Sequence, residues 1–325
     1  MRKLLLGTTA LAAAATLSAN IAVADVSISG YYEWKYTSQS SDLTAQDGTS
    51  FGNDSEIAFK FSNKTDSGLT IGMVTELESD DADTAINEGS MSISGGFGKV
   101  VLGGNDGVGD NYGVASTDLP AEEIYATGVD TLAILNADIS NMAGDASKVA
   151  YHLPAMGGLT AGISYRDSGA AGSADSTEIG AKYAMSAGGA AITLGYATKT
   201  TEDATQDKDD TNMGVKIVSG DISLIISQGQ YEASDEDIES QGASISYKMP
   251  NGMTIGAFSF KSEDDLDVGE EYTASGGEVQ YTIASGLTAV ITVVDYDYKV
   301  TASNHENSPT ADSGTMSQLT LKTSF

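Results

Sequence analysis

The chain of 325 residues holds 46 acidic and 16 basic residues, with a formal net charge of −30 and no cysteine. This acidity repels phosphates and excludes nucleic acid as a natural partner. The lack of cysteine excludes a disulfide framework and a thiolate metal site.

The first segment, residues 1–24, has the features of a secretory signal peptide. A basic start is followed by an apolar run of leucine and alanine, and Ala-Val-Ala at 22–24 is a small-residue cleavage site. The run is too short for a transmembrane helix. We expect this segment to be removed and residues 25–325 to form one domain that starts at Asp25.

Apolar and polar residues alternate along nearly all of the remaining chain. The alternation divides it into about 16 segments of roughly 8 to 12 residues, a length that suits tilted strands in a membrane. No later apolar stretch approaches the length of a membrane-spanning helix. Near the start, Ile28, Tyr32 and Trp34 alternate with Ser29, Glu33 and Lys35.

The polar faces of these segments carry charge. Glu56, Lys60 and Lys182 are examples, and unpaired charges of this kind cannot lie in a dry core. We therefore expect the polar faces to line a wet lumen without buried apolar pairs, and the apolar faces to meet lipid. Phe258 and Phe260 do not follow the alternation of their segment.

The connections between segments fall into two kinds. Short glycine-rich turns have hairpin chemistry, and after four of them the next strand opens with Gly-Leu-Thr or Gly-Met-Thr, at positions 68, 158, 252 and 286. The other connections are longer and acidic. Short turns at one end and long loops at the other predict an all-β, 16-stranded antiparallel transmembrane barrel.

The alternation stops over residues 107–147, after the fifth expected strand. A segment of this length is either functional or disordered. We expect short helical turns within it at 121–125 and 131–135.

The sequence resembles the Gram-negative general diffusion porins. The resemblance rests on the order of its features, which are the signal, the strands, the turn phrases, the long segment and the terminal Phe325. The resemblance implies a homotrimer in the outer membrane, exported through the periplasm and surrounded by lipid and lipopolysaccharide. It implies a water-filled channel for passive diffusion of ions and small hydrophilic solutes. It also implies that the barrel-assembly machinery reads Phe325.

The same resemblance implies that 107–147 is the inward-folded third long loop. It also implies that acidic residues of this loop face basic residues on the barrel wall. The usual Pro-Glu-Phe-Gly-Gly phrase of that loop is missing, and lysines largely replace the usual arginines. With acidic outer loops, we expect a mild preference for cations that fades in high salt. The loop acids are Asp110, Asp118, Glu122, Glu123, Asp130 and Asp138, and the wall bases are Lys35, Lys60, Lys148, Arg166 and Lys322.

Other activities have weaker support. Asp264, Asp265 and Asp267 could bind calcium, but an exposed acidic loop is the simpler interpretation, and no other cofactor is expected. With only His152 and His305 present, a base beside a nucleophile is not expected, so we predict no enzyme. The alternatives are a secreted acidic structural or adhesive β protein, similar to a surface-layer subunit, and a substrate-specific outer-membrane channel.

Overall fold

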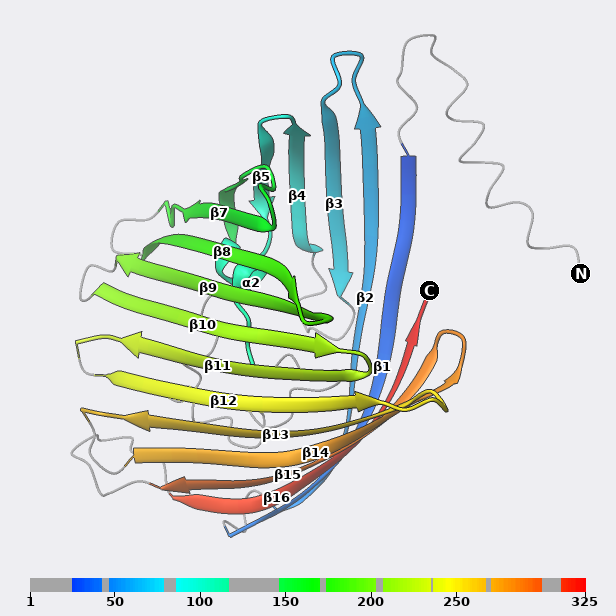
Figure 1. The fold of residues 1–325 in the computed structure, drawn as a ribbon, viewed down its shortest axis with the longest axis vertical. Coiled ribbons are helices and arrows are strands. Elements are labelled where there is room, and N and C mark those ends of the chain that lie inside the picture. The colour runs from blue at the N-terminus through cyan, green and yellow to red at the C-terminus, as the bar shows by residue number, and fades with distance from the viewer. Residues whose placement is uncertain are drawn as a thin grey trace, which may run out of the picture.

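The computed structural model describes residues 25–42, 47–78, 86–116, 146–169, 174–202, 207–234, 236–266, 270–299 and 311–325, without the side chains of 86–88. Over these residues, sixteen antiparallel strands form one closed barrel (Figure 1). The predicted fold class is confirmed. The strands are β1 Asp25–Ser41, β2 Gly48–Lys64, β3 Thr70–Glu78, β4 Ile86–Gly95, β5 Gly98–Gly104, β6 Ser147–His152, β7 Leu159–Arg166, β8 Asp175–Ala187, β9 Ala190–Glu202, β10 Asp207–Ser219, β11 Ile222–Glu232, β12 Asp237–Lys248, β13 Met253–Asp264, β14 Glu270–Ala284, β15 Leu287–Lys299 and β16 Asp312–Ser324.

Each strand pairs with its neighbours in sequence, and β1 closes the ring by pairing with β16. The turns at one end are short. Between β8 and β9 only Gly188 and Gly189 intervene, with φ of 60° and 85°. Two successive positive φ values give a turn whose twist matches that of the flanking strands, and glycine adopts them without strain.

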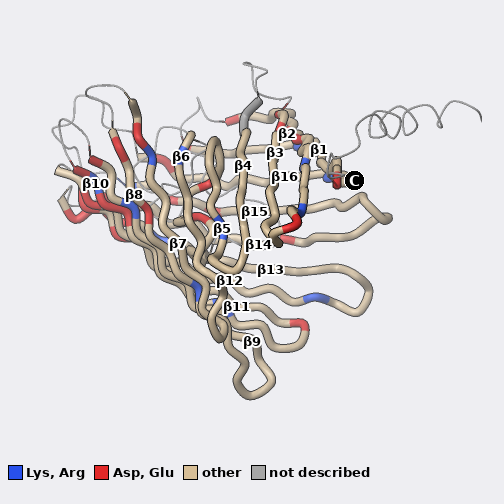
Figure 2. The backbone as a smooth tube through the Cα atoms, turned by 90° about the horizontal axis from the view of Figure 1, so that it is seen from above, with Lys and Arg blue, Asp and Glu red and all other residues tan. Residues whose placement is uncertain are grey.

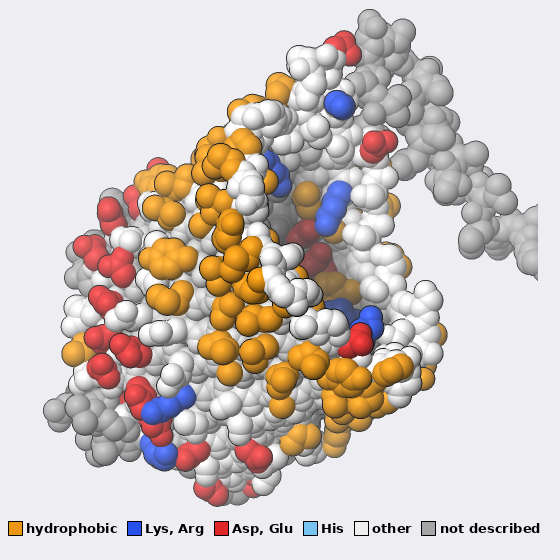
Figure 3. All heavy atoms as spheres, viewed as in Figure 1, with side chains coloured by type: hydrophobic (Ala, Val, Ile, Leu, Met, Phe, Trp, Pro, Cys, Tyr) orange, Lys and Arg blue, Asp and Glu red, His pale blue; other side chains and the backbone are white. Residues whose placement is uncertain are grey.

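The two faces of the wall differ as the alternation predicts. On β8, Ile179 faces outward and is 50% exposed, whereas the neighbouring Glu178 faces inward and is 3% exposed. Hydrophobic side chains form a broad band on the face of the barrel seen in Figure 3. Acidic residues gather toward the long-loop end of β8 and β10 (Figure 2). The outer surface therefore suits a lipid layer bordered by polar groups.

The terminal strand follows the expected facing. Leu319 and Leu321 pair with outward residues of β1, while Lys322 pairs with the inward Glu33. Two backbone hydrogen bonds between Gly30 and Phe325, of 3.2 and 3.1 Å, end this pairing, and the Phe325 ring is largely exposed on the outside.

One expectation about the lumen is wrong, because an apolar cluster lies on the inner face near the long-loop end. Phe258 and Phe260 do not break the alternation. They occupy inward positions opposite Ser244 and Gly242. The inner face accepts such rings because they pack on one another. We call this cluster the lumenal apolar pad; its buried members are Ile238, Phe260, Tyr272, Ala274, Val294, Tyr296, Tyr298 and Met316.

Polar groups at the edge of the pad satisfy its tyrosine hydroxyls. Tyr296 donates to the Asp312 carboxylate at 2.8 Å and accepts from Gln39 at 3.0 Å, and Tyr298 donates to Glu270. Buried tyrosines normally need such partners.

A single short helix, α2 (Val108–Tyr112), occurs in the described part of the chain. No helix among these residues is long and apolar enough to cross a membrane. The helical turns expected at 121–125 and 131–135 lie outside the described residues. The structure instead has α2 at the start of the long segment, where no helix was predicted.

Candidate functional site: the lumen and its inner wall

The start of the long segment, residues 107–116, lies against the inner wall of the barrel. We call it the loop start. It follows the end of β5, and α2 contacts β7, β8 and β9 (Figure 1). Val108 and Ala115 are fully buried there. The loop start therefore reduces the open cross-section of the lumen from the β7–β12 side.

Four backbone N–H groups anchor the loop start to inward side chains. Val108 donates to Ser164 Oγ of β7 at 3.3 Å and Gly109 donates to Glu178 Oε2 of β8 at 2.9 Å. The two later bonds run from Val114 to Asn212 Oδ1 of β10 at 3.1 Å and from Ser116 to Ser227 Oγ of β11 at 2.7 Å. Buried backbone donors are costly to leave unpaired, so these side chains fix the path of the segment.

Glycines on the same wall create the space that the loop start occupies. A Cβ added at Gly180 would lie 2.7 Å from Tyr112 Cβ, and one at Gly195 would lie 2.6 Å from Val114 Cγ2. A Cβ at Gly214 would overlap the Val114 carbonyl oxygen. The absence of side chains lets two backbones approach closely. We call this set the glycine groove; its members are Gly162, Gly180, Gly195, Gly214 and Gly242.

Of the predicted loop acids, the structure describes one. Asp110 belongs to α2 and lies on the side of the lumen formed by β7–β9. The others lie outside the described residues, so their opposition to the wall stays a prediction; they are Asp118, Glu122, Glu123, Asp130 and Asp138.

All five predicted wall bases occupy inward positions, but two of them already have a partner on the wall. Lys35 lies 3.0 Å from the Glu33 carboxylate, and Lys322 forms an ion pair with the same carboxylate. The Lys322 amine also lies 4.7 Å from the centre of the Tyr31 ring. The Glu33 carboxylate therefore offsets part of the positive charge that the sequence assigned to this wall.

The remaining three bases lie on other strands. Lys60 projects inward from β2 and Lys148 from β6, where it is buried. Arg166 is at the long-loop end of β7 and is exposed. The five bases therefore do not form one cluster opposite the loop start.

The two halves of the barrel differ in inward charge. The half formed by β5–β12, the basic half, carries mostly lysine, and the half formed by β13–β16 and β1–β4, the acidic half, carries mostly carboxylates. In the basic half the inward charges of the described strands are Lys99, Lys148, Arg166, Lys182, Lys199, Lys208, Lys216 and Lys248, with Glu178 and Asp210. In the acidic half they are Asp25, Glu33, Asp54, Glu56, Glu76, Glu78, Asp264, Glu270, Glu278 and Asp312, with Lys35, Lys60, Lys64 and Lys322.

A charge separation thus exists across the lumen within the wall itself. Opposed charges across a wet pore orient polar solutes and set ion selectivity. The sequence-based prediction missed it because the five wall bases were opposed only to acids of the long segment, and the inward acids of the wall itself were not counted. The inward acids Glu56, Glu76 and Glu78 lie on that same wall.

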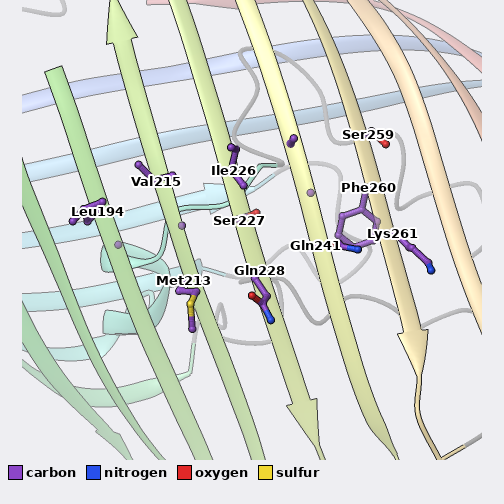
Figure 4. Close-up of a pocket in the computed structure, with 14 residues that line it drawn as sticks. Leu194, Met213, Val215, Ile226, Ser227, Gln228, Gln241, Ser259, Phe260 and Lys261 are labelled. Carbon is purple, nitrogen blue, oxygen red and sulfur yellow. The ribbon is translucent and has the colours of Figure 1, made fainter. Parts of the chain in front are cut away.

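A large cavity of about 790 Å³ lies on the outer face of β9–β13 (Figure 4). The outward side chains Leu194, Met213 and Ile226 line it, and Gly195 and Gly214 contribute backbone. This position places it on the apolar side of the wall, so it is no part of the path through the lumen.

The acidic loop after β13 gives no geometric support for calcium. Asp264 Oδ1 accepts the N–H groups of Leu266 at 2.9 Å and Asp237 at 3.3 Å. Asp267 lies outside the described residues. Among those that are described, no group of three or more candidate ligands could hold a metal ion. The calcium site stays a prediction.

Comparison with family models shows the family of the chain, and comparison with solved structures shows its fold. The family model described as Gram-negative porin matches residues 7–301. Among solved structures, the anion-selective porin from Comamonas acidovorans has a TM-score of 0.68 at 17% identity, covering 93% of this chain and 100% of that one. OmpT of Vibrio cholerae, in a trimer form, has a TM-score of 0.69 at 15% identity, covering 93% and 100%. A mutant of Rh. blastica porin has a TM-score of 0.61 at 15% identity, also covering 93% and 100%. A search of curated proteins found no match.

Proposed function

Because the chain belongs to the Gram-negative porin family, we propose that its outer-membrane channel passes ions and small hydrophilic solutes passively down their gradients. The observation that carries this function is the closed barrel with an apolar outer face and a charged inner face. A secreted structural protein soluble in water would have no use for that outer face, because exposed apolar bands of this size favour association.

Selectivity, in this proposal, comes from charge at two levels. The acidic and basic halves of the wall orient a solute, and the proposed inward path of 107–147 adds the negative charge of its acids to the lumen. With the acidic outer loops, this favours a mild cation preference at low salt. The placement of Asp110 beside the wall supports an inward path for the loop.

The proposed assembly is a homotrimer in lipid and lipopolysaccharide, reached by export through the periplasm with removal of residues 1–24. The trimer form of OmpT supports this assembly at the level of a shared fold. Phe325, exposed on the outside at the short-turn end, is the proposed mark for the barrel-assembly machinery.

We propose neither an enzymatic activity nor a required cofactor, since diffusion through a pore needs neither. The Tyr112 hydroxyl is hydrogen-bonded to Nδ1 of His152, so the imidazole ring has a structural role. Calcium at Asp264, Asp265 and Asp267 would strengthen only the outer loop. A trimer whose thermal stability is the same with calcium and with chelator would remove that part of the proposal.

Planar-bilayer recording tests the function directly. The purified protein in detergent is expected to give stepwise conductance and, under a salt gradient at low ionic strength, a reversal potential of cation-selective sign. Replacing Glu122, Glu123 and Asp130 together with neutral residues is expected to reduce that selectivity. A protein that stays soluble and monomeric without detergent would contradict the channel, and an unchanged reversal potential would contradict the role of the loop acids.

A further inference from the structure

A polar cavity of about 270 Å³ lies in the lumen beside α2, at the edge of the basic half. We call it the lumenal niche. A water occupies ~30 Å³ of liquid, so the niche has room for a small organic solute. Its lining residues are Ser90 of β4, Lys99 and Val101 of β5, His152 of β6, and Asn105, Asp106 and Asn111 of the connecting chain.

The niche contains an available positive charge. Lys99 pairs with His152 across β5 and β6, so both side chains face inward. Within the part of the chain that the structure describes, no carboxylate forms an ion pair with the Lys99 amine, whereas Lys322 in the acidic half is paired with Glu33. A carboxylate entering the niche would therefore meet a lysine that forms no salt bridge with any described residue.

The niche also contains an acceptor without a donor. Asn105 Nδ2 donates to the Asp106 carbonyl oxygen at 2.6 Å, which fixes the orientation of the amide. Its Oδ1 is buried and has no hydrogen-bond partner among the described residues. Buried acceptors are normally satisfied, so this atom is positioned to accept from a bound O–H or N–H group.

The neighbouring groups hold the niche open rather than filling it. Asn111 Nδ2 donates to the Gly107 carbonyl at 2.9 Å. The Tyr112 hydroxyl and His152 Nδ1 lie 2.9 Å apart, which fixes the imidazole ring and leaves Nε2 for another contact. Asn111 and His152 are thus oriented before a solute arrives, which lowers the cost of binding.

On the premise of the proposed channel, we infer that the lumenal niche is a binding site for small carboxylates that carry a hydrogen-bond donor on the adjacent carbon. This class contains α-hydroxy acids and α-amino acids. Lys99 receives the carboxylate, and Asn105 Oδ1 accepts from the adjacent hydroxyl or ammonium group. The site acts as a weak, transient stop beside the loop start, because binding in a channel must also allow exit.

Lactate and propionate provide a matched pair of probes, because both are small monocarboxylates and only lactate carries the α-hydroxyl. In single-channel recordings with purified protein, lactate is expected to reduce the ion current with a half-saturation concentration about fivefold below that of propionate, the effect of one hydrogen bond. Lys99→Gln should raise both concentrations by about fivefold. Asn105→Ala should remove only the difference between the two probes.

Lys216→Gln is the matched control, because Lys216 also faces inward from the basic half and the charge change is the same. It should raise both half-saturation concentrations much less than Lys99→Gln does, because Lys216 does not line the niche. Heat-modifiable migration on gels checks that each variant forms a barrel. Equal effects of lactate and propionate in the unmodified channel would overturn the inference, and so would equal effects of Lys99→Gln and Lys216→Gln. Absence of any conductance would instead contradict the channel itself.

Discussion

The two halves of the barrel wall share one strand geometry but use their inner faces differently. The basic half is lined by small residues over the glycine groove and holds the loop start. The acidic half carries the lumenal apolar pad near the long-loop end, except for Ile238 of β12, and most of the inward carboxylates. The loop start therefore fills space along the inner face of the basic half, whereas large inward side chains fill space along the inner face of the acidic half.

This difference shows how a uniform wall produces an asymmetric pore. The alternation of inward and outward residues is the same around the ring, so both halves present an apolar outer face. Only the size and charge of the inward residues vary. Function in this fold thus depends on the inward positions, whose size and charge are not fixed by the formation of the barrel.

The largest expected effect comes from filling the groove. In Gly214→Ala the new Cβ overlaps the Val114 carbonyl, so the loop start must move toward the centre of the lumen. We expect a lower single-channel conductance and a loss of about 1–3 kcal/mol of stability from overpacking. Bilayer recording and thermal melting in detergent measure the two effects.

Gly52→Ala is the control in the opposite half. Gly52 also faces inward, but a Cβ there would meet nothing closer than the Lys35 Cβ at 3.9 Å. Its conductance should match that of the unmodified channel. If both variants lowered conductance equally, the difference between the two inner faces would not govern the pore.

A smaller effect is expected from changing the charge of the acidic half. Glu33→Gln removes the carboxylate shared by Lys35 and Lys322, so two lysines gain influence over ions in the lumen. The cation-to-anion permeability ratio should fall about twofold, because ~1 kcal/mol at 4 Å in water is further screened in a wet pore. The reversal potential under a salt gradient measures this ratio.

Glu271→Gln is a close match on the outer surface. Glu271 also bridges two lysines, Lys261 at 2.9 Å and Lys299 at 2.7 Å, but all three side chains face outward. Its reversal potential should be unchanged. A shift as large as that of Glu33→Gln would mean that the inner wall has no special role in selectivity.

The smallest expected effect concerns the lumenal apolar pad. Tyr296→Phe removes the hydroxyl that joins Asp312 and Gln39, which should cost about 1 kcal/mol of stability. Tyr281→Phe changes an outward tyrosine that is 46% exposed and should cost less. Melting temperatures in detergent compare the two, and a larger loss for Tyr281→Phe would show that the pad does not stabilise its half.

The sequence predicts the barrel well because water and lipid act on every strand. The facing of Trp34, Lys322 and Leu321 follows from alternation alone, and the structure has each where it was expected. The glycine groove was not predictable in the same way. Gly195 and Gly214 become neighbours only through the register of β9 and β10, and a lone glycine gives no local signal of what it will contact.

The candidate site shows the same division. Inward lysines were found by alternation, but the sharing of Glu33 by Lys35 and Lys322 depends on a pairing between the two ends of the chain. Phe258 and Phe260 were taken to break the alternation because no apolar rings were expected on the inner face, whereas packing within the lumen buries Phe260 and partly buries Phe258. Local patterns report the solvent on each face and not the partner of each side chain.

The pairing of β1 with β16 has a consequence for how the barrel forms. Every other strand contact joins neighbours in sequence, so hairpins can assemble one after another with little loss of chain entropy. Bringing Trp34 to Leu321 instead closes a loop of nearly the whole folded chain. The entropic cost of closing this loop grows only with the logarithm of its length, and it falls once the intervening hairpins are ordered. Pairing of β1 with β16 is therefore favoured as the last step of barrel formation.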